Sequence, residues 1–303
     1  MGGIAVVGTA FVDIKGFPDG EYLRNGRNAG RVEYLHGGVG RNVAEDLANL
    51  GLKPTYVGLV DDTPMGRDVL ARLRRCGVDT DCVLTTEDGL GTWLAVFDSC
   101  GEVAGSISRR PNTVPLLELL ERKGDEIISN ADAVVLQADI DLGVVEKVFA
   151  IAARRGKKVY SIVSNMGIVT QRREVLGRFD CFICNLQEAD MLFSGDLGQK
   201  EPGEMLAFLR ERLAQEALKA VVVTLGEKGS VYISADGEEG FCPARTVEVR
   251  DTTGAGDSFC AGVAAGLTYG KTLAQAVALG TDLAAAVITS SDNVCPCRAY
   301  WDL

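Results

Sequence analysis

Histidine is almost absent from this chain, which has a single one, His36, among its 303 residues. A Ser–His–Asp hydrolase would depend entirely on His36, and no G-x-S-x-G turn is present to expose a nucleophilic serine. No apolar run approaches the roughly 20 residues that span a bilayer. The N-terminus lacks the basic segment and cleavage site of a signal peptide. We therefore expect neither such a hydrolase nor a membrane protein, and we expect a cytoplasmic location.

Positive charge is also scarce, because 31 lysines and arginines face 42 aspartates and glutamates, for a net charge of −11. This balance argues against a nucleic-acid partner, since a long phosphate backbone is bound by a basic surface. It does not argue against a single nucleotide, because helix N-termini and Mg²⁺ neutralise phosphates locally. The net charge is therefore compatible with a small phosphorylated ligand.

The nine cysteines do not form the usual ligand sets of a metal site. Cys181 and Cys184 lie in an apolar run typical of a strand, where positions three apart face opposite sides. Cys295 and Cys297 could face the same side, but further ligands are missing. We expect reduced thiols in the core or at the surface.

Apolar runs rich in valine and isoleucine alternate with segments of helical period, which favours a parallel sheet flanked by helices. Residues of about 12–36 and 91–110 lack that period and predict a small β-layer that forms a lid. No linker rich in proline, serine or charge interrupts the chain, so we expect a single domain over 1–303. The expected central strands are 4–8, 134–139, 158–163, 181–185 and 220–226.

The stretch DTTGAGDSF at 251–259 precedes a long apolar run and has glycines where a backbone bends tightly or approaches a ligand closely. Several N–H groups would point into one space at a helix start, and Asp257 in the first turn would share it. Such an arrangement suits phosphoryl transfer, because N–H dipoles stabilise developing negative charge and a carboxylate takes the proton of the attacking hydroxyl. The structural alternative is a tight turn in which Asp257 caps the helix.

Three further segments have the character of ligand-binding turns. HGGVGRNVAEDL at 36–47 is not a phosphate-binding Walker loop, and Val43 stands where a dinucleotide fingerprint needs its third glycine, which argues against an oxidoreductase. NLQE at 185–188 and TLGEKG at 224–229 follow predicted strands, whose C-terminal ends bind ligands in open α/β sheets. The alternatives are a helix cap for the first and a hairpin turn for the second.

Taken in order, GGVGRN, N-x-x-E, TLGxxG and DTTGAGDSF resemble the PfkB or ribokinase family of carbohydrate and nucleoside kinases over essentially the whole chain. The resemblance implies a ribokinase-like three-layer α/β/α domain with a mostly parallel central sheet and a small β-lid. It implies an enzyme that uses ATP and Mg²⁺, and K⁺ in some members, to phosphorylate a hydroxymethyl or hydroxyl group on a sugar or nucleoside. The alternative is a non-catalytic sugar or nucleoside sensor on the same scaffold.

The resemblance also implies roles for individual residues. Asp257 would be the general base, and the backbone of Gly254, Ala255 and Gly256 would form the anion hole. Glu188 would help to organise Mg²⁺ through water. Asp251 and Thr253 would contribute to a monovalent-cation site. The nucleotide would contact Asn185, Thr224, Leu225, Gly226 and Gly229. The substrate would contact Asp13, Gly37, Gly38, Arg41, Asn42 and Asp139.

The identity of the substrate rests on fewer positions. Phe11 stands where ribokinase-like members often carry asparagine, which argues against simple ribose. Arg41 makes GGVGRN similar to pseudouridine kinases, so pseudouridine is the leading nucleoside, with another monosaccharide equally open. Arg109, Arg110 and Asn112 either accommodate a base or belong to lid packing. Exposed β-layers need covering and family lids often pair, so we expect a homodimer through the lid.

Overall fold

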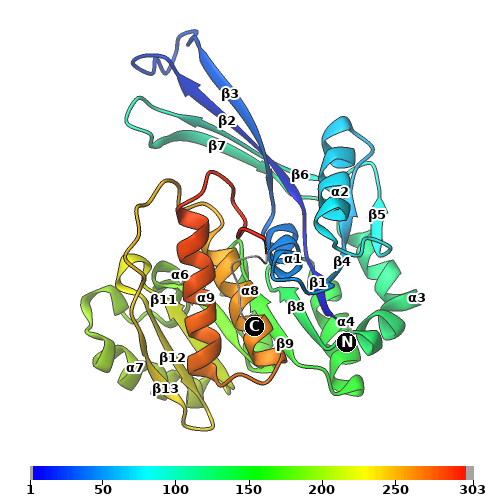
Figure 1. Ribbon diagram of the computed structural model, residues 1–303, viewed down its shortest axis with the longest axis vertical. Helices are drawn as coiled ribbons and strands as arrows, with labels where there is room; N and C mark the ends of the chain where they lie inside the picture. The colour runs from blue at the N-terminus through cyan, green and yellow to red at the C-terminus, as the bar shows by residue number, and fades with distance from the viewer. Residues whose placement is uncertain (1–2, 298–303) are drawn as a thin grey trace.

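The computed structural model describes residues 3–297. Residues 1–2 and 298–303, the ends of the single domain expected over 1–303, lie outside the described residues. The body has a central sheet with helices on both faces, and a second, smaller sheet projects away from it (Figure 1). The cavity described below lies between these two parts.

The central sheet consists of two sheets that meet edge to edge. Its strands are β1 (Ile4–Val7), β4 (Thr55–Val60), β5 (Val83–Thr85), β8 (Ala133–Gln137), β9 (Val159–Ile162), β10 (Phe182–Asn185), β11 (Ala220–Thr224), β12 (Ser230–Ser234) and β13 (Glu239–Cys242). The strand orders are β5-β4-β1-β8-β9, all parallel, and β10-β11-β12-β13, in which β12 and β13 run antiparallel to their neighbours. The two join at β9 and β10, where the N–H of Ser161 donates to the carbonyl of Cys181 at 3.1 Å.

Helices cover both faces because the strands are apolar on both. Ala5 and Val7 pack in one hydrophobic cluster, and Ile4 and Val6 pack in the other, as expected for strands buried on two sides. The first face is covered by α3 (Val114–Asn130), α4 (Leu142–Arg155), α5 (Met166–Val169), α6 (Leu186–Phe193) and α7 (Pro202–Gln215). The second is covered by α1 (Val39–Asn49), α2 (Pro64–Cys76), α8 (Ala255–Thr268) and α9 (Leu273–Ile288).

Short 3₁₀ turns complete the body, namely η1 (Arg173–Arg178), η2 (Leu197–Gln199) and η3 (Gly226–Lys228). The three-layer α/β/α architecture expected from the sequence is confirmed, and each of the expected central strands is present with both ends within two residues of the expected bounds. No helix within residues 3–297 is long and apolar enough to cross a membrane.

The cysteines of the sheet alternate as the strand period predicted. Cys184 packs in the cluster beneath α3 to α7, and Cys181 packs in the cluster beneath α1, α2, α8 and α9. Cys295 is buried and Cys297 is exposed. All nine cysteines fall within the described residues, and each of them is a free thiol.

The smaller sheet has the order β3-β2-β6-β7 and comes from the two segments without helical period. Its strands are β2 (Phe11–Pro18), β3 (Gly30–Gly37), β6 (Gly91–Phe97) and β7 (Val103–Arg109). Asp13 on β2 pairs with Trp93 on β6, which pairs with Ser108 on β7, so these three side chains share one face. All three line the cavity against the body.

Candidate active site

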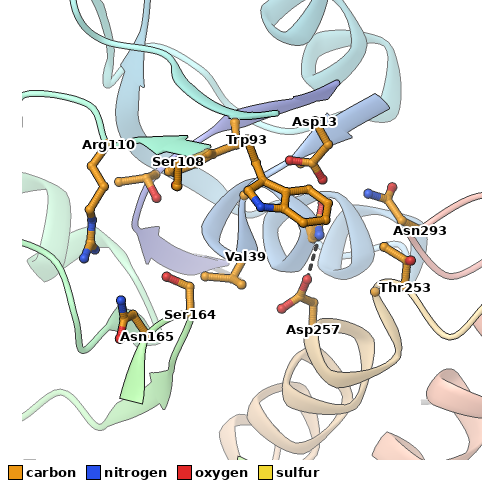
Figure 2. A pocket seen from close by; sticks show the side chains of 16 residues that line it. Asp13, Val39, Trp93, Ser108, Arg110, Ser164, Asn165, Thr253, Asp257 and Asn293 are labelled. Atoms are coloured by element: carbon orange, nitrogen blue, oxygen red, sulfur yellow. Dashed lines mark hydrogen bonds between the residues drawn. The ribbon is translucent and has the colours of Figure 1, made fainter. Parts of the chain in front are cut away.

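A cavity of about 300 Å³ lies between the smaller sheet and the body (Figure 2). The smaller sheet contributes Phe11, Asp13, Trp93 and Ser108, and the residue after β7, Arg110, also lines the cavity. The last residue of β3, Gly37, belongs to the smaller sheet and also lines the cavity. The body contributes Thr9, Gly38, Val39, Asn42, Ser164, Asn165, Thr253, Gly254, Asp257 and Asn293. These residues are far apart in sequence and meet because β1, β9 and the starts of α1 and α8 converge here.

The start of α8 depends on a glycine that no other residue could replace without strain. Gly254 precedes the helix with a positive φ of 82°, and a Cβ there would lie 2.0 Å from the carbonyl oxygen of Asn293. The first N–H groups of a helix have no partner within it and favour an anion. The N–H of Ala255 already donates to the carbonyl of Thr252 at 3.3 Å, whereas a Cβ at Gly256 would meet open space. The chain thus leaves room for a phosphate at Gly256.

Asp257 lies in the first turn of α8, and Asn42 of α1 holds its carboxylate. Nδ2 of Asn42 donates to Oδ2 of Asp257 at 2.6 Å (Figure 2). Burial raises the pKa of Asp257 to about 6, against the lowering effect of the Asn42 bond and the Arg41 charge, while Asp13 and Glu188 raise it further. A carboxylate with such a pKa is ionised at neutral pH yet accepts a proton more readily than an ordinary aspartate.

The Gly-Gly turn brings Asp13 against the backbone at the other side of the cavity. A Cβ at Gly37 would lie 2.6 Å from a carboxylate oxygen of Asp13, so only glycine leaves room for that side chain. Gly38 has a φ of 91°, and a Cβ there would lie 2.5 Å from the carbonyl oxygen of Thr9. Burial raises the pKa of Asp13. The turn therefore places the Asp13 carboxylate at the edge of the cavity, where substrate hydroxyls could bind.

Arg41 does not line the cavity, in contrast to its expected role as a substrate contact. Its side chain is 0% exposed, and Nη1 donates to Oε2 of Glu45 at 2.8 Å. Nε donates to the carbonyl of Gly37 at 3.3 Å, and Nη2 donates to the carbonyl of His36. Adjacent residues of a helix point about 100° apart, so with Asn42 facing the cavity Arg41 faces away from it. Arg41 fixes the backbone where β3 passes into α1.

Asp139 also lies behind the cavity wall rather than in it. It is buried, and Oδ2 accepts from Nη2 of Arg110 at 2.7 Å and from Oγ of Ser164 at 2.7 Å. Arg110 and Ser164 both line the cavity, so Asp139 holds two side chains of the cavity wall in place. Arg109 instead pairs with Asp88, and Oδ1 of Asn112 accepts from the N–H of Val114. Of Arg109, Arg110 and Asn112, Arg110 is the one that reaches the cavity.

The expected nucleotide residues lie together at the C-terminal ends of β10 and β11, where Asn185 and Thr224 are neighbours in register. Asn185 and Glu188 form a reciprocal cap at the start of α6, with bonds of 2.9 and 2.8 Å between each side chain and the other's N–H. Burial raises the pKa of Glu188. Strand ends of this kind are the ligand-binding edge of a parallel sheet.

The turn after β11 is built on glycines. Gly226 has a φ of 62° and Gly229 a φ of 115°, and the N–H of Leu225 donates to the carbonyl of Gly229 at 2.7 Å. A Cβ at Gly229 would lie 2.1 Å from the carbonyl oxygen of Cys242. The structure thus contains both structural alternatives, a helix cap at NLQE and a tight turn at TLGEKG. They lie at adjacent strand ends.

Asp251 and Thr253 form a compact turn before α8. Oδ1 of Asp251 accepts from the N–H and the hydroxyl of Thr253 at 2.8 and 2.7 Å. Thr253 lines the cavity, and Asp251 does not. Within residues 3–297, no cluster of three or more histidine, cysteine, aspartate or glutamate side chains is arranged to hold a metal ion.

Six of the residues that line the cavity were not identified from the sequence, because none of them lies in a recognisable motif. They are Thr9, Trp93, Ser108, Ser164, Asn165 and Asn293. Asn293 lies in the segment TSSDNVCPC at 289–297, which contains none of the four motifs described above. Trp93 could have been suspected, because it is one of two tryptophans and falls in the segment expected to form the lid.

Comparisons with known proteins agree with this geometry. The pfkB family carbohydrate kinase pattern matches residues 1–295. Guanosine-inosine kinase of Exiguobacterium acetylicum is 34% identical over 295 residues, which cover 97% of this chain and 96% of that protein. Pseudouridine kinase of Escherichia coli (strain K12) is 26% identical over 279 residues, 90% of this chain and 86% of that protein. The structure of Arabidopsis thaliana ribokinase complexed with ribose and ATP has a TM-score of 0.84 at 23% identity, covering 98% and 96% of the two chains. The chain therefore belongs to the pfkB family of carbohydrate kinases, enzymes that transfer a phosphoryl group to a hydroxyl group.

Proposed function

We propose that this chain is an ATP-dependent nucleoside kinase that phosphorylates a hydroxyl or hydroxymethyl group of the ribose. The observation that carries the proposal is that Asp257 and Trp93 line the same cavity (Figure 2). A partly buried carboxylate with a raised pKa suits proton removal from a hydroxyl, and an indole offers a stacking surface for a base. The guanosine-inosine kinase relative makes these two nucleosides the first candidates, ahead of pseudouridine. No observation favours the sensor alternative.

In the proposed reaction, Asp257 accepts the proton of the attacking hydroxyl. Asn42 orients that carboxylate through its amide nitrogen, and its Oδ1 is buried without a partner among the described residues. An unpaired buried oxygen is costly, so a substrate hydroxyl that donates to it would be bound favourably. Asp13 and the backbone at Gly37 would bind further ribose hydroxyls.

The residues fit a bound ATP–Mg²⁺ complex. The open space at Gly256 and the N-terminus of α8 suit a phosphate, and Glu188 offers one carboxylate. Mg²⁺ usually keeps several waters and binds through one or two carboxylates together with substrate phosphates, so a three-carboxylate cluster is not required. When bound, ATP supplies the phosphoryl group and Mg²⁺ neutralises part of its charge. Asn185, Thr224 and the turn from Leu225 to Gly229 would contact the nucleotide.

The smaller sheet would act as a lid, which excludes water from the cavity and limits hydrolysis of ATP. In support, this sheet contributes Asp13 and Trp93 to the cavity although it projects from the body (Figure 1). A monovalent cation such as K⁺ would bind near Asp251 and Thr253, which precede α8. Turnover measured in potassium and in choline salts would test that cation site, and equal rates would contradict it.

The homodimer would form through the outer face of the lid. Tyr34, Ile14, Leu94 and Ile107 pair across the four strands in one row, and Ile107 is 71% exposed. Ile14 packs partly against the body, while Tyr34, Leu94 and Ile107 are exposed. Exposed apolar side chains in one row favour covering by a second copy. Light scattering should give a dimer mass for the protein and a monomer mass for Ile107→Glu. A monomeric parent protein would exclude this dimer.

ATP consumption, measured with Mg²⁺ and K⁺, tests the proposed function. The acceptors would be inosine, guanosine, adenosine, pseudouridine, ribose and other common monosaccharides. We expect turnover with nucleosides at much higher kcat/KM than with ribose. Turnover confined to monosaccharides would keep the family's chemistry and exclude a nucleoside kinase, whereas turnover confined to pseudouridine would restore it as the leading substrate.

A further inference from the structure

We propose that Arg110 makes the enzyme select nucleosides whose base carries a carbonyl oxygen at its far edge, such as inosine and guanosine, over adenosine, which carries an amino group there. The inference rests on the proposed nucleoside kinase function. It adds the residue that reads the base and the chemical feature that this residue reads.

Arg110 lies across the cavity from the catalytic carboxylate. Figure 2 shows Arg110, Ser164 and Asn165 on one side, Asp257 and Thr253 on the other, and the Trp93 indole between them. A nucleoside whose ribose reaches Asp257 and whose base lies against Trp93 would extend the edge of that base toward Arg110.

The guanidinium of Arg110 is held in place from behind. Nη2 donates to Oδ2 and to the carbonyl oxygen of Asp139, each at 2.7 Å. Asp139 is itself fixed, because its carboxylate also accepts from the N–H and the hydroxyl of Ser164 at 2.9 and 2.7 Å. The side chain of Arg110 stays 36% exposed, and its Nε and Nη1 have no protein acceptor in the described part of the chain. A pre-oriented cation with donors to spare therefore faces the ligand.

Arg110 would favour a base with an acceptor at its edge, because a guanidinium can donate hydrogen bonds but cannot accept them. The other polar side chains near it, Ser108, Ser164 and Asn165, can donate or accept and so could bind either kind of base. The other charged side chains of the cavity, Asp13 and Asp257, lie at the ribose end. A carbonyl oxygen at the 6-position accepts from Arg110, whereas the amino group of adenine at the same position is a donor, so the guanidinium loses that acceptor and faces a second donor.

The matched substrates are inosine and adenosine, which differ at the 6-position of the purine. For the parent protein we expect kcat/KM to favour inosine by roughly ten- to hundredfold, the size of a hydrogen bond to a charged group. Arg110→Met should lower the inosine-to-adenosine ratio of kcat/KM by the same factor. Arg109→Met is the control, because this neighbouring arginine pairs with Asp88 outside the cavity and its loss should leave the ratio unchanged.

Removing Arg110 alone would leave Asp139 buried without its cation, so thermal melting must accompany the kinetics. The double variant Arg110→Gln with Asp139→Asn removes both charges, and it should lose the preference for inosine while it folds. An unchanged ratio in both variants would overturn the role of Arg110 and leave the nucleoside kinase intact. A parent protein that phosphorylates monosaccharides but neither nucleoside would overturn both.

Discussion

Nδ2 of Asn42 lies 2.6 Å from Oδ2 of Asp257, a hydrogen bond that joins residues 215 positions apart in the chain. One turn further along α1, Asp46 accepts from the hydroxyl of Ser258 at 2.9 Å. Neighbouring residues of α8 are therefore tied to positions i and i+4 of one helix. The orientation of the carboxylate is set by α1, while its position is set by the glycine turn before α8.

Replacing Asp257 with asparagine should lower kcat by at least about a hundredfold, because the hydroxyl proton loses its acceptor. ATP affinity, measured by calorimetry, should stay close to that of the parent protein, since the N-terminus of α8 is unchanged. Asp282→Asn is a control on the surface of α9, where Asp282 pairs with Arg245. A rate near that of the parent would remove Asp257 as the base.

The kcat/KM for the preferred nucleoside should rise with pH through about 6 and level off above it. Burial raises the pKa of Asp257 to about 6, and the carboxylate must be ionised to accept a proton. Asn42→Ala should move this inflection to higher pH, because the Asn42 hydrogen bond lowers the pKa. A pH–rate profile with no inflection in this range would contradict the assignment.

Folding stability should fall as pH rises, in part because of Asp46. Burial raises the pKa of Asp46 from 3.8 to about 8 in the fold. The folded chain therefore keeps a proton that the unfolded chain releases, so this stabilisation is full below the unfolded pKa and is lost as pH rises through the folded one. Urea unfolding at intervals from about pH 5 to about pH 8 should show the loss, and Asp46→Asn should flatten it. An equally steep decline in that variant would assign the dependence to other groups.

Alanine at the two glycines around the start of α8 should separate folding from phosphate binding. Gly254→Ala forces a Cβ to within 2.0 Å of the Asn293 carbonyl oxygen at a positive φ, so we expect clear destabilisation. Gly256→Ala adds a methyl group in open space, so the melting temperature should hold while the KM for ATP rises. An unchanged KM in Gly256→Ala would show that no phosphate approaches this turn.

Arg41→Met should destabilise the fold by about 1.5–3 kcal/mol, the range for a lost hydrogen bond to a charged group, because it removes one of the two cations that neutralise the buried carboxylate of Glu45. Arg67→Met is a suitable control, since Arg67 pairs with Asp62 at the surface, where ion pairs contribute about 0–1 kcal/mol. Urea unfolding measures both. If both variants lost the same small amount of unfolding free energy, Arg72 alone would be enough to neutralise the Glu45 carboxylate.

The fold and the reactive turn were predictable because their signals are local. Strands such as β1 and β11 are short apolar runs, and DTTGAGD is a contiguous turn. Arg41 is buried and does not line the cavity, whereas its neighbour Asn42 does, and sequence order alone does not show which side of the helix each residue takes. The spacing of Arg41 and Glu45, one turn apart, was the available clue to an internal ion pair. Trp93 and Asn293 reach the cavity through long-range strand pairing and loop packing, which no local pattern encodes.

The ion pair behind the Gly-Gly turn also constrains redesign of this enzyme. Replacing Arg41 alone with the uncharged residue of another turn would leave Glu45 in the core with Arg72 as its remaining counter-charge. Grafting another member's turn therefore requires exchanging Arg41 and Glu45 together, as one unit. Changes of substrate specificity should begin on the other side of the cavity, at Arg110 and its partner Asp139, where substitutions leave the Arg41–Glu45 ion pair intact.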